Sequence, residues 1–311
     1  MTVLPELPLA EYQFNFQVLQ ELRSSDFSGS LWHGVFGKAL YESVCINRGS
    51  ACEDCPFLHS CDYSLLFTAP RPLKTELMRH YQTIPVPHII RVENLTSMLL
   101  FPKQIVSIRL IVIGTANQKL QLIIWALLKA GINGLGKNRS KLQLQEVWLH
   151  HPNALPRLIY QPPEIKAFPL PELLPIIAMP QQVTLRFISP YKQSGKTSNE
   201  GLDIPAFLMA IVRRVSLLQY FYTDKQLDAD FKQLKVLVHA LKVSNNQLVG
   251  QEQSRYSAKH RKMLDASGVL GSLELDLQGM EALWPYLYLG QWLNVGKNAS
   301  MGFGCYQLLL V

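Results

Sequence analysis

Residues 296–304 read GKNASMGFG, and the tripeptide GKN that opens this stretch also occurs at residues 136–138. Each copy follows an apolar, helix-like segment and precedes a run with the composition of a closing strand. Self-similarity at matched positions of two halves indicates that one structural plan is used twice. We base the predicted fold on this repeated glycine loop.

The segments around the two loops follow similar orders. Residues 12–18, YQFNFQV, alternate apolar and polar side chains like a half-buried strand, and residues 31–45 place apolar side chains four apart like an amphipathic helix. Further predicted strands and helices lie at 105–114, 117–131, 142–149, 181–190, 204–222, 272–279 and 280–294. Strand, helix, strand, strand, helix, strand is the ferredoxin-like order. We predict an α+β fold of two tandem ferredoxin-like (RRM-like) domains with a C-terminal glycine-rich loop.

Proline content suggests where the two domains meet. Eight of the 19 prolines fall in residues 151–180, which is typical of a connector. The predicted domains are residues 1–150, with a cysteine-rich insertion at 45–61, and residues 181–311, which end in the glycine-rich loop.

The charge is concentrated in one part of the chain. The whole protein has 30 Lys and Arg against 23 Asp and Glu, and residues 186–262 carry the entire formal excess of +7. Such a balance suits a polyanionic partner, although it also occurs in proteins that have none. The N-terminal stretch lacks the basic and apolar regions of a signal peptide, and no apolar run is long enough to cross a bilayer, so we expect a cytoplasmic protein with no membrane partner.

Four of the five cysteines lie within 17 residues, at Cys45, Cys52, Cys55 and Cys61. The spacing C-x6-C-x2-C-x5-C indicates a metal rather than a disulfide framework. Four thiolates would suit a structural zinc or, as the alternative, an iron–sulfur cluster, and they would leave no open coordination position for catalysis.

The two glycine loops favour contact with phosphate, because glycines let a phosphate approach successive backbone N–H groups. The stretches match neither a Walker motif nor a dinucleotide fingerprint. The alternative is a glycine-eased turn with solvated basic side chains. The loop residues that we expect to bind RNA are Lys137, Asn138, Arg139 and Lys141 in the first copy and Lys297, Asn298 and Ser300 in the second.

The chain resembles the CRISPR-associated endoribonucleases of the RAMP superfamily that process repeat RNA. The residues that carry the resemblance are VGKNASMGFGCYQL at 295–308, GINGLGKNRSKLQLQEV at 131–147, SGSLWHGVFGKAL at 28–40, CDYSLLF at 61–67 and RYSAKHRKM at 255–263. The resemblance implies two ferredoxin-like domains, a pre-crRNA substrate, and cleavage that needs no divalent metal and leaves a 2′,3′-cyclic phosphate.

Cleavage of this kind needs a base for the 2′-OH, a proton donor for the leaving 5′-oxygen and a cation near the phosphorane. The resemblance implies that His33 is the proton-transfer residue, because the family often carries a catalytic histidine near the start of this helix. At helical spacing His33, Gly37 and Tyr41 share one face, with a glycine gap that a sugar or phosphate could enter, and Lys38 borders it. The candidate catalytic residues are therefore His33, Lys38 and Tyr41.

Alternatives to this assignment come from the same residues. His33 could instead be a partly buried histidine whose ring bonds a backbone carbonyl. Tyr12 could reach the region from the neighbouring strand, and His260 is the reserve candidate because it lies in the basic segment RYSAKHRKM.

The second half supplies the remaining candidates for RNA binding. Basic side chains with an interleaved tyrosine combine phosphate contacts with base stacking. These candidates are Arg213, Arg214, Arg255, Tyr256, Lys259, His260, Arg261 and Lys262.

The sequence thus predicts a metal-independent endoribonuclease that cleaves CRISPR repeat RNA to generate crRNAs. Its rival is a non-catalytic crRNA-binding RAMP subunit that contacts other subunits of a CRISPR effector complex. A third interpretation is a nucleic-acid-binding protein unrelated to CRISPR that carries a structural zinc.

Overall fold

The computed structural model describes residues 4–24, 29–92, 98–193, 201–225, 229–252, 254–257 and 262–310. The chain divides into two compact units. One comprises Pro8–Glu172, and the other comprises Leu173–Val311 together with Met1–Leu7.

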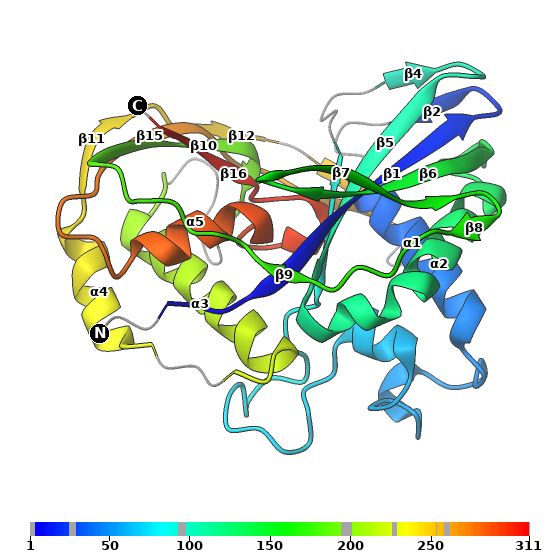
Figure 1. The fold of residues 1–311 in the computed structure, drawn as a ribbon, viewed down its shortest axis with the longest axis horizontal. Helices are drawn as coiled ribbons and strands as arrows, with labels where there is room; N and C mark the ends of the chain where they lie inside the picture. Colours follow the sequence, from blue (N-terminus) through cyan, green and yellow to red (C-terminus); the bar gives the residue numbers. More distant parts are fainter. Residues whose placement is uncertain are drawn as a thin grey trace. The chain divides into compact units, whose positions relative to one another are not determined.

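The N-terminal unit contains a main antiparallel sheet and two helices that lie against it (Figure 1). Its central elements, in chain order, are β1 (Pro8–Val18), α1 (Gly29–Val44), β3 (His88–Val92), β5 (Ile105–Ile113), α2 (Leu120–Asn133) and β6 (Leu142–His151). The strands lie in the order β3-β5-β1-β6, so β1 is central and pairs with both β5 and β6. This order of elements and strands is the ferredoxin-like fold.

The period-2 pattern of residues 12–18 explains the position of β1. Tyr12, Phe14 and Phe16 are completely buried on one face of the sheet, while the polar residues between them lie on the other. Helix α1 packs on the buried face, where the rings of Phe16 and Trp32 are 4.9 Å apart. The sheet therefore holds the first turns of α1 in a fixed position.

Smaller elements surround this centre. They are β2 (Leu22–Ser24), η1 (Cys52–Asp54), the π-helical turn η2 (Ser64–Thr68), β4 (Met98–Leu100), η3 (Gly114–Lys119), β7 (Ala154–Gln161), β8 (Glu164–Ile165) and β9 (Glu172–Leu173). Strand β2 pairs with β4, and η1 and η2 belong to the segment between α1 and β3.

The region 151–180, predicted as a connector, differs from that expectation. Strand β7 pairs with β6 and then with β8, so this part of the region extends the N-terminal sheet. Proline is tolerated there because β7 carries Pro156 at an irregularity in its pairing with β6, where no ladder N–H is required. Proline content alone did not separate an irregular edge strand from a linker.

The C-terminal unit repeats the same plan. Its elements are β10 (Gln182–Tyr191), α3 (Ile204–Tyr222), α4 (Phe231–Ala240), β11 (Lys242–Asn246), β12 (Val249–Gln251), β13 (Ser254–Ser257), β14 (Lys262–Asp265), β15 (Gly268–Asp276), α5 (Trp284–Leu293), η5 (Ala299–Met301) and β16 (Tyr306–Leu310). The main strands lie in the order β11-β15-β10-β16, which equals β3-β5-β1-β6 in the first unit. The predicted tandem ferredoxin-like fold is confirmed.

Helix α3 is long and apolar enough to cross a membrane by length and composition alone. In this structure it is a core helix of its unit. Phe207, Ile211 and Val215 are completely buried, and Phe207 contacts the rings of Tyr191 and Tyr306 on the adjacent sheet. Asp203 caps its N-terminus by accepting a hydrogen bond from the Ala206 N–H at 3.0 Å.

Candidate active site and nucleic-acid interface

His33 lies in the second turn of α1 and is mostly buried, with 8% of its surface exposed. Its ring packs against Phe67 at 4.4 Å and stacks on His88 at 5.4 Å between ring centroids. The structure therefore places the predicted proton-transfer residue inside an aromatic cluster rather than on an open helix face.

The glycine gap predicted beside His33 is filled by protein. A Cβ at Gly37 would collide with the Phe67 ring, whose Cε1 and Cε2 atoms would lie 2.6 and 2.7 Å away. The expectation that a sugar or phosphate could settle in this gap is wrong for the structure described, because Phe67 occupies it. Gly37 is a close-approach glycine. Gly34, by contrast, faces open space.

The segment after the cysteines positions Phe67. Phe67 lies in η2, and the centroid of its ring is 5.5 Å from that of Tyr63 and 6.0 Å from that of Phe36. His88, at the start of β3, completes the cluster, with its Nδ1 3.0 Å from the Leu66 carbonyl oxygen. Sequence reasoning missed both Phe67 and His88, because neither carries a local signal that relates it to a helix more than 20 residues away.

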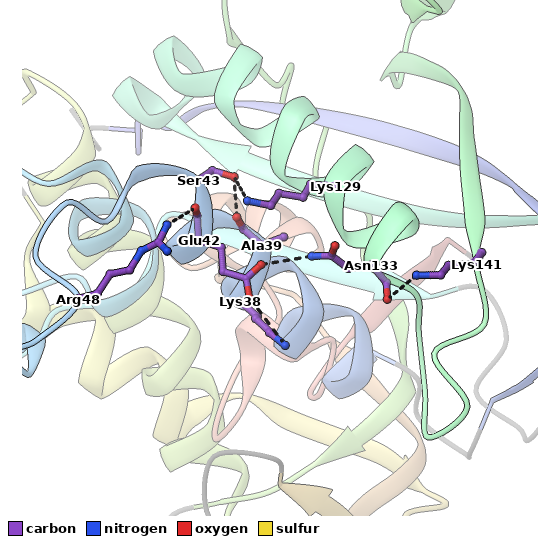
Figure 2. Close-up of polar contacts among 8 residues, drawn as sticks. All are labelled: Lys38, Ala39, Glu42, Ser43, Arg48, Lys129, Asn133 and Lys141. Atoms are coloured by element: carbon purple, nitrogen blue, oxygen red, sulfur yellow. Dashed lines mark hydrogen bonds and ion pairs between the residues drawn. The ribbon is translucent and has the colours of Figure 1, made fainter.

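Tyr41 and Lys38, the other two candidate catalytic residues, lie apart from the His33 ring. Tyr41 is half-buried and contacts the ring of Tyr63 at 5.2 Å, and its pKa is raised, first by a hydrogen bond with Cys45. Lys38 is exposed and forms an ion pair with Glu42 at 3.8 Å on the seam between α1 and α2 (Figure 2). The ring of Tyr63 therefore stands beside Tyr41, and the Lys38 ammonium points to a carboxylate instead of to His33.

Figure 2 shows that polar contacts join α1 to α2 along this seam. Glu42 also accepts a hydrogen bond from the Asn133 side chain at 3.3 Å, and Lys129 donates to Ser43 at 3.5 Å. The contacts of Asn133 with Glu42 and of Lys129 with Ser43 cross from α2 to α1 and therefore link the two helices.

Tyr12, the candidate on the neighbouring strand, is a core residue. Its hydroxyl donates to the Asn117 side chain at 3.0 Å, and burial raises its pKa well above the ordinary value. The Asn117 amide in turn donates to the carbonyls of Val112 and Gly114 at 3.0 Å each. Tyr12 therefore closes a buried polar network and does not reach the helix surface.

The first glycine loop is a tight turn between α2 and β6. Leu135 and Ser140 exchange two backbone hydrogen bonds of 2.9 Å, and Gly134 and Gly136 have positive φ angles. Lys137, Asn138 and Arg139 are exposed at its tip. Lys141 instead donates from Nζ to the carbonyls of Ile132 and Asn133 at 2.7 and 3.2 Å, and so caps the C-terminus of α2.

The closing loop, residues 296–304, is bonded to the end of β10. Ser189 donates to the Gly302 carbonyl at 2.7 Å, and the N–H of Gly304 donates to the Pro190 carbonyl at 2.9 Å. Gly296, Asn298, Gly302 and Gly304 all have positive φ angles. The N–H groups of Lys297, Met301 and Gly302 also donate to backbone carbonyls. Several amides that we expected to face RNA therefore stabilise the loop itself, while the Lys297 side chain is exposed and Asn298 and Ser300 are half-buried.

The paired arginines of α3 have different environments. Arg213 is exposed, whereas Arg214 donates from Nε to the Leu293 carbonyl at 2.7 Å, at the C-terminus of α5. Burial lowers the pKa of Arg214 to about 10, so the side chain stays charged at neutral pH and complements the α5 dipole. Of the two arginines, Arg213 is the one that leaves the apolar stripe of α3.

The remaining RNA-binding candidates belong to the β13–β14 region. Arg255 and Tyr256 lie on β13 and Lys262 on β14, and the two strands pair antiparallel. Lys259, His260 and Arg261 lie outside the described residues.

The four clustered cysteines are half-buried and none forms a disulfide. All four belong to the described part of the chain, and within that part no group of three or more His, Cys, Asp or Glu side chains has the arrangement of a metal site. The predicted metal therefore remains a prediction.

Comparisons with known proteins agree with this architecture. Residues 7–171 match the family model AF_1859_N, described as an N-terminal domain, and residues 185–306 match the model of the CRISPR-associated endoribonuclease Cas6. No curated protein matches the sequence significantly.

Several solved structures have a similar fold. A Cas6 product complex has a TM-score of 0.55 and 17% identity, over 97% of this chain and 100% of the other. Cas6 from Thermus thermophilus has a TM-score of 0.51 and 13% identity, over 97% and 99%. A partial Cas6-RT-Cas1–Cas2 complex has a TM-score of 0.52 and 15% identity, over 98% of this chain and 47% of the other.

The duplicated ferredoxin-like fold agrees with the family matches, which fall on the two units separately. The AF_1859_N match covers more than half of the chain, so the chain belongs to that family. Residues 185–306, in the C-terminal unit, are similar to the Cas6 endoribonuclease family.

Proposed function

We propose that this protein cleaves CRISPR repeat RNA within the repeats to generate crRNAs, with His33 as a proton-transfer residue. The observation that carries the proposal is the occurrence, in one chain, of a Cas6 domain and of a histidine on the first helix of the preceding ferredoxin-like unit. The roles of the individual site residues are part of this proposal.

The reaction is an internal transfer. The 2′-oxygen attacks the adjacent phosphorus while the bond to the 5′-oxygen breaks, which leaves a 2′,3′-cyclic phosphate and a free 5′-hydroxyl. The 2′-OH proton goes to a base, and the leaving oxygen receives a proton from an acid. His33 performs one of these proton transfers, and an exposed cation near the RNA strand stabilises the charge that develops at the phosphorus.

Access to His33 requires a local change, because a proton-transfer group must come within hydrogen-bond reach of its substrate. Phe67 covers one side of the His33 ring and fills the space above Gly37. We propose that RNA binding shifts the segment that carries Phe67 away from His33, so that the His33 ring becomes accessible to the RNA.

The RNA grip comes from exposed cations on both units. Lys137 and Arg139 at the first loop, Lys297 at the closing loop and Arg213 on α3 are exposed. We propose that these residues, with the basic segment at 255–262, contact phosphates. Lys141 and Arg214 contribute to RNA binding only indirectly. Their side-chain nitrogens, which the sequence predicted to bind RNA, cap helices α2 and α5 instead.

We propose that the reaction itself uses no metal, because the nucleophile is the RNA's own 2′-OH and proton transfer can be supplied by side chains. A metal on the four cysteines, a zinc or an iron–sulfur cluster, would be structural. Four thiolates complete a tetrahedral sphere and leave no position for substrate.

The second candidate function is a non-catalytic crRNA-binding subunit that contacts other proteins of a CRISPR effector complex. The burial of His33 behind Phe67 is the observation that favours it. The two functions share the RNA grip and differ only in the chemistry at His33.

One experiment separates them. The full chain is incubated with end-labelled repeat RNA in EDTA under single-turnover conditions. We expect one defined cut with a 2′,3′-cyclic phosphate end, and we expect His33→Ala to slow it by about 10²–10⁴-fold while repeat affinity changes only a few-fold. The exposed His80 provides the matched control, His80→Ala, which should cleave normally. Binding without any cut would establish the subunit instead, and normal cleavage by His33→Ala would remove His33 from the mechanism.

A further inference from the structure

The segment from Cys45 to Cys61 folds compactly without a hydrophobic core of its own. None of its 17 residues is buried. Ile46 is 82% exposed and Phe57 is 44% exposed, so its two largest apolar side chains point outward. A short segment that buries no apolar side chain needs another source of stability, such as disulfides or a metal.

Cysteines make up most of the half-buried positions of this segment. Only six of its residues are half-buried, and four of them are Cys45, Cys52, Cys55 and Cys61. Thiols thus occupy the positions that apolar side chains take in an ordinary core. No two of them form a disulfide.

Local backbone hydrogen bonds shape the segment at each of the four cysteines. The Cys55 N–H donates to the Cys52 carbonyl at 3.2 Å in the turn η1, and the Cys61 N–H donates to the Phe57 carbonyl at 2.8 Å. Cys45 follows the last turn of α1, where its N–H donates to the Tyr41 carbonyl at 2.9 Å. The pKa of Cys52 is raised by burial and then by the nearness of Cys45, Cys61 and Cys55, in that order.

Donors that support thiolates are also present. The Asn47 side chain lies 3.6 Å from the Cys55 sulfur and donates to it, and the Tyr41 side chain is hydrogen-bonded to Cys45. Hydrogen bonds to ligand sulfurs orient them and tune the bound metal. In the described part of the chain the four cysteines do not have the arrangement of a metal site. Protonated thiols have no reason to converge on one point, and metal binding removes their protons.

We propose that Cys45, Cys52, Cys55 and Cys61 bind a metal centre through four thiolates, and that this centre holds the segment between α1 and η2 in place. Binding releases the four thiol protons and replaces the missing apolar core by metal–sulfur bonds. The proposal does not depend on the proposed cleavage of RNA.

The position of the centre links it to the aromatic cluster. Cys45 ends α1, and the Cys61 carbonyl accepts from the Leu65 N–H at 2.9 Å at the start of η2. From there the rings of Tyr41, Tyr63, Phe67 and His33 follow one another with centroid distances of 5.2, 5.5 and 4.4 Å. The metal centre therefore positions the aromatic rings that cover His33.

The primary test is elemental analysis of the full chain, purified without oxygen or chelators from cells supplied with zinc and iron. We expect a bound metal that survives gel filtration. A colourless protein with about one zinc, or a brown protein with iron, inorganic sulfide and visible absorption, supports the site and identifies its occupant. Metal-free protein whose four thiols react with a thiol reagent equally fast with and without added zinc overturns it.

Variants assign the metal to these residues. Cys55→Ser should lose most of the metal, whereas Cys305→Ser, at the buried cysteine of the C-terminal unit, should keep all of it. If Cys55→Ser does not fold, the protons released when zinc is added to reduced, metal-free wild-type protein give the same answer, because four-thiolate binding releases several protons at neutral pH. Retention of the metal by folded Cys55→Ser, or no proton release, contradicts the proposal.

Discussion

Two glycines of α1, three residues apart, should respond oppositely to alanine. Gly34 faces open space, so Gly34→Ala should stabilise the protein by about 1 kcal/mol, the difference in helix propensity between the two residues. Gly37→Ala gains the same propensity, but its Cβ collides with the Phe67 ring. The ring has little freedom to move, because Tyr63, His33, His88 and Phe36 surround it.

Overpacking a filled space costs about 1–3 kcal/mol. Subtracting the propensity gain leaves Gly37→Ala destabilised by roughly 0–2 kcal/mol, so the two variants should differ by about 1–3 kcal/mol. In a unit of this size that difference corresponds to about 2–4 °C in the melting temperature for each kcal/mol. Thermal unfolding of both variants against the wild type measures it.

The double variant Gly37→Ala with Phe67→Ala tests the cause. Once the Phe67 ring is removed, Gly37→Ala should become stabilising by about 1 kcal/mol, which gives a coupling energy of about 1–3 kcal/mol between the two positions. If Gly37→Ala stabilises the wild type as much as Gly34→Ala does, Phe67 does not fill the gap and the reasoning about His33 access is refuted.

Three further outcomes are expected. Gly304→Ala should destabilise the protein by at least about 1 kcal/mol, because the φ of Gly304 is +64° and an added Cβ collides with the Val295 carbonyl. Gly279→Ala should cost less, because Gly279 has a φ of +76° but faces open space. Urea unfolding compares the two variants. The contact with Lys192 lowers the pKa of Asp265 below its ordinary 3.8, so the contact adds stability above that value and loses it as the pH falls through the folded-state pKa. The stability difference between wild type and Asp265→Asn should therefore shrink from about pH 6 to about pH 2, and a constant difference would contradict the assignment. Finally, repeat affinity should fall linearly on a log–log plot against salt, by about 0.7 for each phosphate contacted on a single strand; a flat plot would exclude the electrostatic grip.

Local sequence patterns predicted much of the fold. Alternation at residues 12–18 identified β1, and the four-residue spacing after residue 30 identified α1. The repeated GKN marked the turns before β6 and β16, the strands that close the ferredoxin-like order of the two units. The second strand of the ferredoxin-like order, β3 in one unit and β11 in the other, was not located from the sequence. Five residues at the edge of a sheet carry little periodicity. Their pairing with β5 and β15 is a long-range contact.

The candidate site shows where sequence reasoning ended. From the sequence alone one could predict that His33 lies on a glycine-bearing helix, that cations cluster in the second half, and that four cysteines lie within 17 residues. The tertiary structure added that Phe67 fills the space at Gly37 and that Lys141 and Arg214 cap helices. It also showed that amides of the closing loop donate to carbonyls of the loop itself and of residues 190 and 192. The reason is physical: helix and strand periods act between near neighbours, whereas these contacts join residues that come together only after the sheet has paired.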